Sequence, residues 1–226
     1  MTKTAILVDG GFYKTRARTL LGEKTPQERA EELEKYCLAH LKSNHENAEL
    51  YRIFYYDCPP LGKKAYHPFL KKQIDLSKSP HYQWMNDFLN ELKKKRKFAL
   101  RMGRLSEEQC GYLLTSDTIK KLCNGSRKFE DLKESDFKIE IVQKGVDMKI
   151  GVDIASLAYK QQVNQIILIS GDSDFVPAAK LARREGIDFI LDPMKAHIKD
   201  DLFEHIDGIR SKIGYISKLL PIESEE

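Results

Sequence analysis

The sequence predicts an α/β protein with a mainly parallel central sheet that is covered by helices on both faces. Two observations support this class. Apolar or β-branched segments of strand length alternate with longer segments of helical periodicity along the chain. Several strand-like segments, such as residues 165–169 (QIILI), are continuous apolar runs and do not alternate with polar residues. Such strands are typical of parallel sheets buried on both faces, and the alternation is typical of βαβ units.

The expected strands are short apolar runs that end in turn-forming residues. Residues 3–8 (KTAILV) end at Asp9, Gly10 and Gly11, which predicts a buried strand followed by a turn. Residues 49–56 (ELYRIFYY) are rich in aromatic side chains and stop shortly before a pair of prolines, which is typical of a strand. The other expected strands are residues 98–105, 138–143, 165–169 and 187–191.

The expected helices are marked by capping residues. Thr25 is a good N-cap, and Pro26 suits the first position of the helix that follows it. Gly186 is placed where a glycine commonly ends a helix. The expected helices are residues 26–42, 80–96, 148–162 and 175–185.

The middle of the chain departs from this alternation. Residues 57–137 contain a Lys-rich stretch and a polar stretch without clear periodicity. We therefore expect a single domain over residues 1–226 with a variable insertion around residues 57–137. A chain of 226 residues, 41% of them hydrophobic, can bury a core without disulfides or metal ions. The four cysteines form no CxxC pair, so neither a zinc pattern nor a disulfide framework is expected.

Composition also bears on location and partners. The sequence has no run of about 18 apolar residues, so we expect no transmembrane helix. The apolar run near the N-terminus is too short for the core of a signal peptide, so we expect a cytoplasmic protein with no membrane partner. A homo-oligomer is compatible with the sequence. The net charge of +4 is a mild positive bias that is compatible with nucleic-acid binding.

Acidic residues follow most of the expected strands. Asp9 ends the first strand, Asp172 and Asp174 follow QIILI, and Asp192 follows IDFIL. Asp147 lies just beyond the strand expected over residues 138–143. The carboxyl ends of parallel strands meet at one edge of a sheet, where ligands bind in such folds, so we expect these acids to converge there. A simpler interpretation stays open, because Asp is common at helix caps and turns.

Asp153 is a further acidic candidate. The apolar stripe of its expected helix includes Ile150, Ile154 and Leu157, which puts Asp153 at the edge of the buried face. A carboxylate at such a position needs a partner. A core Thr, Lys or Arg could supply that partner.

A cluster of carboxylates predicts a divalent metal ion. Two unit charges about 4 Å apart interact by roughly 4 kcal/mol at an effective dielectric constant near 20, so the cluster needs protons, basic side chains or a metal. Oxygen-only ligands without Cys or His suit Mg²⁺ or Mn²⁺ better than zinc. Such a site can activate water and stabilise charge at a phosphodiester.

Basic residues gather in two stretches. The first comprises Lys93, Lys94, Lys95, Arg96, Lys97, Arg101 and Arg104. The second comprises Lys63, Lys64, Lys71 and Lys72, with the aromatic residues Tyr66 and Phe69 nearby. Aromatic side chains among cations suit single-stranded nucleic acid. A solvated helix end explains the first stretch equally well.

Three motifs together resemble the NYN-domain family, specifically its LabA-like bacterial branch. They are VDGG at residues 8–11, KGVDMKIGVDI at residues 144–154 and SGDSDF at residues 170–175. The family is PIN-like and related in fold to the PIN and FEN nucleases. The resemblance implies a Rossmann-like three-layer α/β/α fold, divalent-metal binding and a proposed ribonuclease role. Many relatives carry Asn two or three residues after the first Asp, where this sequence has Gly11 and Phe12.

The resemblance also implies roles for individual residues. Asp9, Asp172 and Asp174 resemble metal-site acids, and the second motif offers Asp147, with Asp153 as its second candidate. Ser170 and Ser173 would orient the phosphate or the carboxylates. The residues expected to hold the phosphate backbone are Lys144, Lys93, Lys94, Lys95, Arg96, Arg101 and Arg104.

We therefore predict a Mg²⁺- or Mn²⁺-dependent nuclease in which Asp9, Asp147, Asp172 and Asp174 carry the reaction. Its expected substrate is RNA, with single-stranded DNA as the alternative. The main rival is a non-catalytic RNA- or metal-binding regulatory module of the LabA-like type, in which a basic side chain would block one of the acids.

Two other enzyme classes are disfavoured. A phosphohydrolase of the haloacid-dehalogenase type needs a second Asp where this chain has Gly11. A dinucleotide-binding protein needs a GxGxxG motif, and none follows the first strand.

Overall fold

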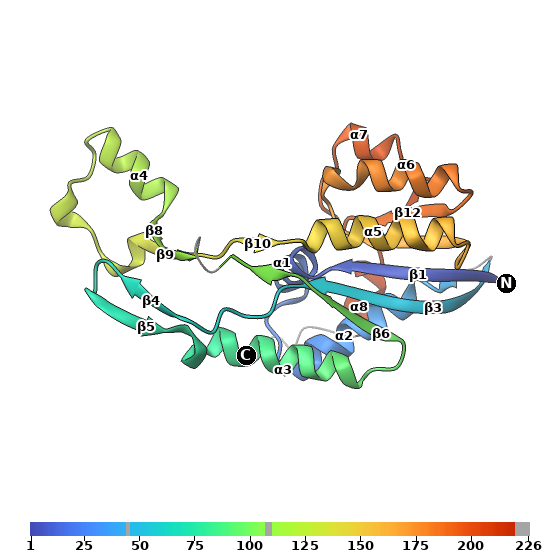
Figure 1. Ribbon diagram of the computed structural model, residues 1–226, viewed down its shortest axis with the longest axis horizontal. Helices are drawn as coiled ribbons and strands as arrows, with labels where there is room; N and C mark the ends of the chain where they lie inside the picture. Colours follow the sequence, from blue (N-terminus) through green and yellow to red (C-terminus); the bar gives the residue numbers. More distant parts are fainter. Residues whose placement is uncertain (44–45, 107–109, 220–226) are drawn as a thin grey trace. The chain divides into compact units, whose positions relative to one another are not determined.

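Strand β1 (Thr2–Asp9) lies at the centre of the main sheet in the computed structural model (Figure 1). It pairs in parallel with β11 (Gln165–Ile169) on one side and with β3 (Glu46–Asp57) on the other. The parallel order β13-β12-β11-β1-β3-β6 is completed by β6 (Phe98–Met102), β12 (Asp188–Asp192) and β13 (Gly208–Ile209). A short strand, β2 (Lys42–Ser43), pairs with β3 in the antiparallel direction.

The structure describes residues 1–43, 46–106 and 110–219, and the chain folds into two units. Unit 1 comprises Met1–Asp57, Asp87–Gly103 and Gly145–Glu226 and contains the main sheet. Unit 2 comprises Cys58–Asn86 and Arg104–Lys144. The single domain with an insertion around residues 57–137 stays a prediction. Within those limits, residues 87–103 pack with unit 1.

The path of the chain through the sheet is doubly wound. From β1 the chain moves outward to β3 and β6, returns to the other side of β1 at β11, and then moves outward to β12 and β13. The direction therefore reverses between β1 and β11. In open α/β sheets this topological switch point is where ligands bind, outside the carboxyl ends of the strands.

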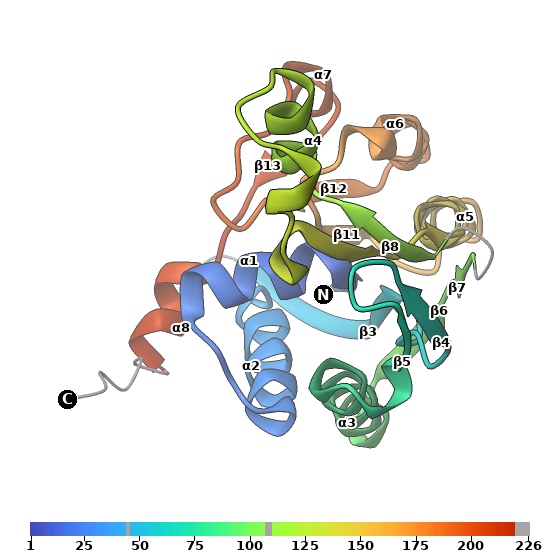
Figure 2. The same ribbon diagram turned by 90° about the vertical axis from the view of Figure 1, so that its left-hand side faces the viewer.

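Helices cover both faces of the sheet, which confirms the predicted three-layer α/β/α class. The outward path to β6 uses α1 (Gly10–Leu21), α2 (Pro26–Ala39) and α3 (Pro80–Lys94). The return path uses α5 (Val146–Tyr159) and α6 (Val176–Arg184). Figure 2 shows α5 and α6 on the opposite side of the sheet from α2 and α3. The remaining short helices of unit 1 are α7 (Asp200–Phe203) and α8 (Ile213–Leu219).

The core of unit 1 explains the continuous apolar strands. Residues 5–8 of β1 and all five residues of β11 are buried. The helix predicted after Thr25 begins at Pro26, and Thr25 and Glu28 form a reciprocal capping box. Within residues 1–43, 46–106 and 110–219, no helix is both long and apolar enough to cross a membrane.

Unit 2 consists of short antiparallel pairs. These pairs join β4 (Lys64–His67) to β5 (Lys72–Asp75), β7 (Arg104–Leu105) to β10 (Gln143–Lys144), and β8 (Gly111–Leu114) to β9 (Phe137–Glu140). In the described residues, the α-helix α4 (Ser116–Cys123) lies wholly in unit 2, and residues 80–86 of α3 also belong to it. Its small core contains Leu61, Ala65, Leu76 and Cys110.

Three local predictions are wrong. The strand expected over residues 138–143 is divided into β9 and β10, and both belong to two-stranded pairs outside the main sheet. The turn expected after Asp9 is the start of α1, because the Asp9 side chain caps that helix despite the two glycines. The strand expected over residues 98–105 is divided at Gly103, whose N–H donates to the carbonyl oxygen of Asp57 at 2.7 Å. The chain leaves the main sheet at that point and continues as β7 in unit 2.

Substitution of Gly10 tests how closely the start of α1 packs against β3. A Cβ atom on Gly10 would lie 2.6 Å from the Tyr55 ring and 2.6 Å from the carbonyl oxygen of Tyr56. Because a backbone atom cannot move aside cheaply, we expect Gly10→Ala to lower the free energy of unfolding by roughly 1–3 kcal/mol. Urea denaturation measures this change.

Gly151 provides the matched control, since it also lies in a helix of unit 1 but has no atom within 4 Å of an added Cβ. We expect Gly151→Ala to raise the free energy of unfolding by about 0.5–1 kcal/mol through helix propensity. Equal effects of the two substitutions would contradict the close approach at Gly10.

Candidate active site

The register of β1 and β11 brings Asp9 and Ser170 together at the switch point. Val8 is paired with Ile169, so the next residue of each strand lies at the carboxyl edge. The Oγ of Ser170 donates a hydrogen bond to Oδ2 of Asp9 at 3.2 Å. The Oδ1 of Asp9 accepts from the backbone N–H of Phe12 at 3.1 Å. Asp9 is therefore held from both neighbouring segments.

Ser170 also positions the segment that follows β11. Its Oγ accepts a hydrogen bond from the backbone N–H of Asp172 at 3.3 Å. Asp172 in turn accepts from the backbone N–H of Asp174 at 3.0 Å and caps the 3₁₀ helix over residues 173–175. In this segment, Asp172 therefore has the helix-capping role that is common for Asp. Both carboxylates remain exposed to solvent.

Asp147, the fourth acid of this group, comes from helix α5. It lies in the first turn of α5, after Gly145, which has φ +80°. Partial burial raises the pKa of the Asp147 carboxyl, although the residue is largely exposed, and the negative charges of Asp172 and Asp174 raise it further. Burial likewise raises the pKa of Asp9, with a smaller contribution from the charge of Asp147. Asp147 is therefore close enough to each of the other three carboxylates for their charges to repel. We call Asp9, Asp147, Asp172 and Asp174 the acidic edge.

A groove begins at the acidic edge and runs between α5 and α6. It has a volume of about 390 Å³, and Asp147 and Asp174 both line it. Its walls include small or apolar residues from the two helices, among them Gly151, Ala155 and Ala178. The groove leaves both carboxylates accessible to a ligand.

The acidic edge lacks neutralising partners within the described part of the chain. In residues 1–43, 46–106 and 110–219, no salt bridge involves any of its four carboxylates. The described residues also contain no group of three or more His, Cys, Asp or Glu arranged to hold a metal ion. The donor chemistry still suits Mg²⁺ or Mn²⁺, because all four donors are carboxylates and Mg²⁺ keeps several waters when one or two carboxylates bind it.

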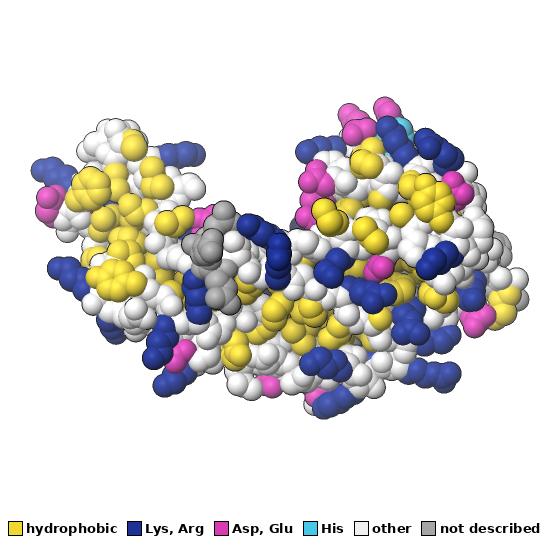
Figure 3. Space-filling model, viewed as in Figure 1, with side chains coloured by type: hydrophobic (Ala, Val, Ile, Leu, Met, Phe, Trp, Pro, Cys, Tyr) yellow, Lys and Arg dark blue, Asp and Glu magenta, His cyan; other side chains and the backbone are white. Residues whose placement is uncertain are grey.

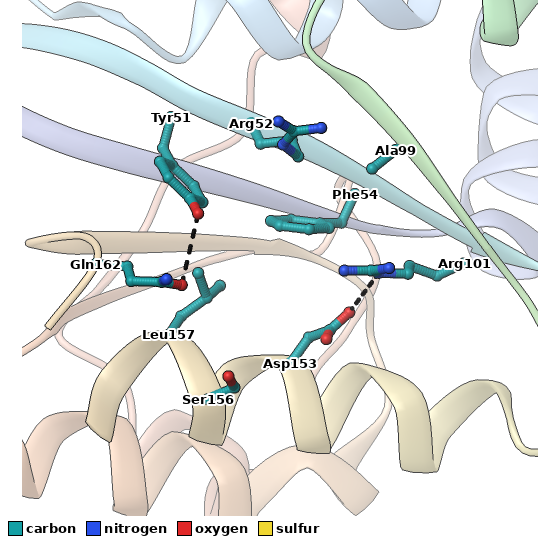
Figure 4. A pocket seen from close by; sticks show the side chains of 9 residues that line it. All are labelled: Tyr51, Arg52, Phe54, Ala99, Arg101, Asp153, Ser156, Leu157 and Gln162. Carbon is teal, nitrogen blue, oxygen red and sulfur yellow. Dashed lines mark hydrogen bonds and ion pairs between the residues drawn. The ribbon is translucent and has the colours of Figure 1, made fainter. Parts of the chain in front are cut away.

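Asp153 is distinct from the acidic edge. Its Oδ2 accepts a hydrogen bond from Tyr56 Oη at 2.8 Å. It also accepts one from Arg101 Nε at 3.0 Å (Figure 4). The partner expected for a carboxylate at the edge of the buried face is therefore Arg101. The same ion pair engages Arg101, which the sequence had placed among the phosphate-binding residues.

The cations at the end of α3 and directly after it lie away from the acidic edge. Lys93, Lys94, Lys95 and Arg96 precede the start of β6, which is the amino edge of the parallel sheet. Lys95 pairs with Glu34 at 2.7 Å, and Lys94 pairs with Glu91 at 2.6 Å. On the face shown in Figure 3, Lys and Arg side chains are scattered and form no single patch. The structure does not bring this stretch to the acids.

The other predicted residues have separate places. In unit 2, Lys144 and Arg104 are paired with each other in the β7–β10 ladder. In unit 1, Ser173 Oγ accepts a hydrogen bond from Lys199 Nζ at 3.2 Å. Asp192 is fully buried, and its carboxylate binds Tyr36, His40 and the backbone N–H of Met194.

Sequence reasoning missed two residues near the acidic edge. Asp57 ends β3 as Asp9 ends β1, and the pKa of Asp9 is raised slightly by its charge. It is buried and binds Lys14 Nζ at 2.6 Å and Tyr55 Oη at 2.8 Å. The strand-ending position of Asp57 was a usable signal. The sequence contains no such signal for Lys199, because this residue lies 26 residues from Ser173, which it contacts.

Comparisons with known proteins give one family. The model of the NYN domain matches residues 85–206, a range that includes Asp147, Asp153, Asp172 and Asp174 and begins after β1. No curated protein matches the chain. A crystal structure of a protein of unknown function from Vibrio parahaemolyticus is similar at 15% identity and a TM-score of 0.46, covering 92% of this chain and 91% of that chain. The LabA-like branch stays a prediction.

We expect the repulsion at the acidic edge to lower the free energy of unfolding. In metal-free buffer of low ionic strength we expect Asp172→Asn to raise the free energy of unfolding by about 0.5 kcal/mol, a value kept small because solvent screens these exposed groups. Asn keeps the side-chain oxygen that caps the 3₁₀ helix. The gain should shrink as salt is added. Thermal and urea unfolding measure it.

Asp207→Asn is the matched control, because Asp207 is a paired acid of the same unit. It binds Arg183 Nε at 2.8 Å and the backbone N–H of Phe189 at 2.8 Å. We expect that substitution to lower the free energy of unfolding by about 1 kcal/mol. A loss of stability in Asp172→Asn at low salt would show that the acids do not repel.

Proposed function

This chain belongs to the NYN-domain family of PIN-like nucleases, and we propose that it is a divalent-metal-dependent nuclease that hydrolyses RNA at the acidic edge. PIN-like nuclease domains commonly use divalent metals. The observation that carries the proposal is the group of four carboxylates without salt bridges in the described chain, next to the switch point of a doubly wound sheet. Like charges kept together at a cost in stability are typical of a functional site.

We propose that Asp9, Asp147, Asp172 and Asp174 hold one or two Mg²⁺ or Mn²⁺ ions. Such an ion would neutralise charge on the phosphodiester and activate water for hydrolysis. Asp9 is fixed by Ser170 and by the backbone of α1, so it supplies a rigid anchor. Asp147, Asp172 and Asp174 are exposed and can adjust to a ligand. We leave Asp153 out of the ligand set, because Arg101 already neutralises it.

The substrate-binding cations in this proposal differ from the predicted set. Lys199 is held beside the acidic edge through Ser173, so it is suited to contact a phosphate there. Arg104 and Lys144 form a basic pair in unit 2 that would bind the RNA backbone. The cations of α3 are not included, since they lie at the amino edge of the sheet.

A non-catalytic RNA- or metal-binding module is the second candidate. One observation favours it, namely that the described residues contain no ready-made group of three metal ligands. The pairing of Asp153 with Arg101 also matches the blocked acid expected of such a module. Metal binding without cleavage would distinguish it from the nuclease.

Metal binding predicts a rise in stability. If the acidic edge binds Mn²⁺ or Mg²⁺, a metal concentration 10 to 100 times the dissociation constant should raise the free energy of unfolding by about 1.4 to 2.7 kcal/mol. The double substitution Asp172→Asn, Asp174→Asn should remove this gain, and EDTA should reverse it. Thermal unfolding with and without metal measures both. An equal gain in the double variant would place the metal elsewhere.

Nuclease activity is tested by cleavage of labelled single-stranded RNA and DNA with Mn²⁺, Mg²⁺ or EDTA. We expect metal-dependent cleavage of RNA that falls at least 100-fold in Asp172→Asn, Asp174→Asn, because removal of charged groups that act on the transition state commonly costs a factor of this order. The control is Asp117→Asn, Glu130→Gln, which removes two exposed charges from unit 2. Cleavage retained by the first variant would contradict the site, and binding of metal without cleavage would favour the second candidate.

A further inference from the structure

A second pocket lies on unit 1 between α5 and the strands β3 and β6 (Figure 4). It has a volume of about 280 Å³. Its apolar wall is formed by Tyr51, Phe54 and Leu157, and its polar rim includes Arg52 and Arg101. The pocket is separate from the groove between α5 and α6 at the acidic edge, and none of the four acids of that edge lines it.

A β-bulge creates the aromatic wall of this pocket. Thr4 is paired with Leu50 and Ala5 with Arg52, so Tyr51 is an extra residue in β3. Without the bulge, side chains would alternate strictly, and Tyr51 would face away from Arg52 and Phe54. With the bulge, the Tyr51 and Phe54 rings lie 6.4 Å apart, and both line the pocket. Bulges commonly redirect a side chain next to a functional site.

The charge of the pocket is positive. Arg101 lies over the Phe54 ring at 5.3 Å and pairs with Asp153, the one acid among the lining residues. Arg52 is exposed, and in the part of the chain that the structure describes no carboxylate pairs with it. Lys3 adds a further cation over the Tyr51 ring at 5.1 Å. An anion would therefore find an available guanidinium beside an aromatic wall.

We propose that this pocket binds a single nucleotide, with its base against Tyr51 and its phosphate on Arg52. An aromatic wall beside a guanidinium is the combination that binds nucleic-acid bases and phosphates without reading sequence. Ser156 and Gln162 line the pocket and supply hydroxyl and amide groups for the sugar or the base edge. The inference goes beyond the proposed function, because binding at this pocket does not require cleavage.

Two sources of the nucleotide share this chemistry, a free nucleotide and one residue of an RNA strand. Helix α5 connects the pocket to the acidic edge, since Asp147 and Asp153 lie six residues apart on it. That separation is about 9 Å along the helix. A strand that occupies the pocket would thus reach the acidic edge within a few nucleotides, and the experiment below distinguishes the two sources.

The test measures binding in EDTA, where metal-dependent cleavage cannot occur. The probe is a fluorescein-labelled hexamer of single-stranded RNA, followed by fluorescence anisotropy, with adenosine monophosphate, uridine monophosphate and inorganic phosphate as competitors. We expect Arg52→Gln to weaken binding of the hexamer about tenfold and to reduce the slope of log affinity against log salt by about 1. We expect Tyr51→Ala to weaken binding about tenfold through lost stacking.

Two controls match these variants in residue type. Arg184 is an exposed arginine at the end of α6, and Tyr159 is an exposed tyrosine at the end of α5. Neither lines the pocket, so Arg184→Gln and Tyr159→Ala should leave the affinity unchanged. Arg52 is exposed, so Arg52→Gln should fold normally. This variant keeps the test valid even if Tyr51→Ala folds poorly.

Competition by the monophosphates at concentrations that leave inorganic phosphate without effect would support a free nucleotide as the ligand. Binding of the hexamer without such competition would support a residue of an RNA strand. Equal affinity of all variants, equal competition by inorganic phosphate, or no binding of any probe would overturn the proposal. Failure of the nuclease proposal would look different, because it concerns cleavage with metal and the acids of the acidic edge.

Discussion

The parallel, in-register pairing of β1 with β11 is the constraint on which the rest of the molecule depends. It sets Asp9 beside Ser170, and Ser170 then links the first strand to the segment that carries Asp172 and Asp174. A shift of one residue would exchange the side chains that one of these strands directs to each face of the sheet, and it would separate Asp9 from Ser170. The buried apolar side chains of β1 and β11 therefore fix the site, although none of them contacts a ligand.

Unit 1 contains other acids near the sheet, and these acids have partners. Asp57 is neutralised by Lys14, Asp153 by Arg101, and Asp192 is held by Tyr36 and His40. The acidic edge has no such partner among the described residues, and partial burial together with the negative charges of Asp172 and Asp174 raises the pKa of Asp147. Basic side chains thus lie beside the carboxylates of Asp57 and Asp153, but in the described residues none forms a salt bridge with the acidic edge. That selectivity favours a ligand for the unpaired group over a general surplus of acid.

The sequence allowed the sheet and the identity of the acids to be predicted, because both depend on local patterns. Continuous apolar runs mark β1 and β11, and each is followed directly by an acid or a serine at the carboxyl edge. The helix α1 could not be predicted, because two glycines disfavour a helix and only the cap by Asp9 and the packing against Tyr55 offset that preference.

Contacts between residues far apart in the chain could not be predicted, because they do not depend on local patterns. Nothing local tells that Arg101 meets Asp153 across 52 residues, or that the cations of α3 come to the amino edge while the acids meet at the other. The bulge at Tyr51 is also invisible in the sequence, since it arises from the register between β1 and β3. The residue types can be taken from the sequence, but which residues contact one another depends on the fold.

Net charge illustrates the difference between composition and placement. Unit 2 contains 13 Lys and Arg and 9 Asp and Glu, so it accounts for the whole net charge of +4. Unit 1 contains 25 residues of each sign and is neutral as a whole. Its acids nevertheless meet at the carboxyl edge, where they would repel an RNA phosphate. Exposed charges act mainly within a Debye length of about 8 Å at physiological salt, so distant cations compensate little. The approach of a phosphate to the acidic edge therefore depends on positive charge bound at that edge, which connects the proposed metal to substrate binding as well as to hydrolysis.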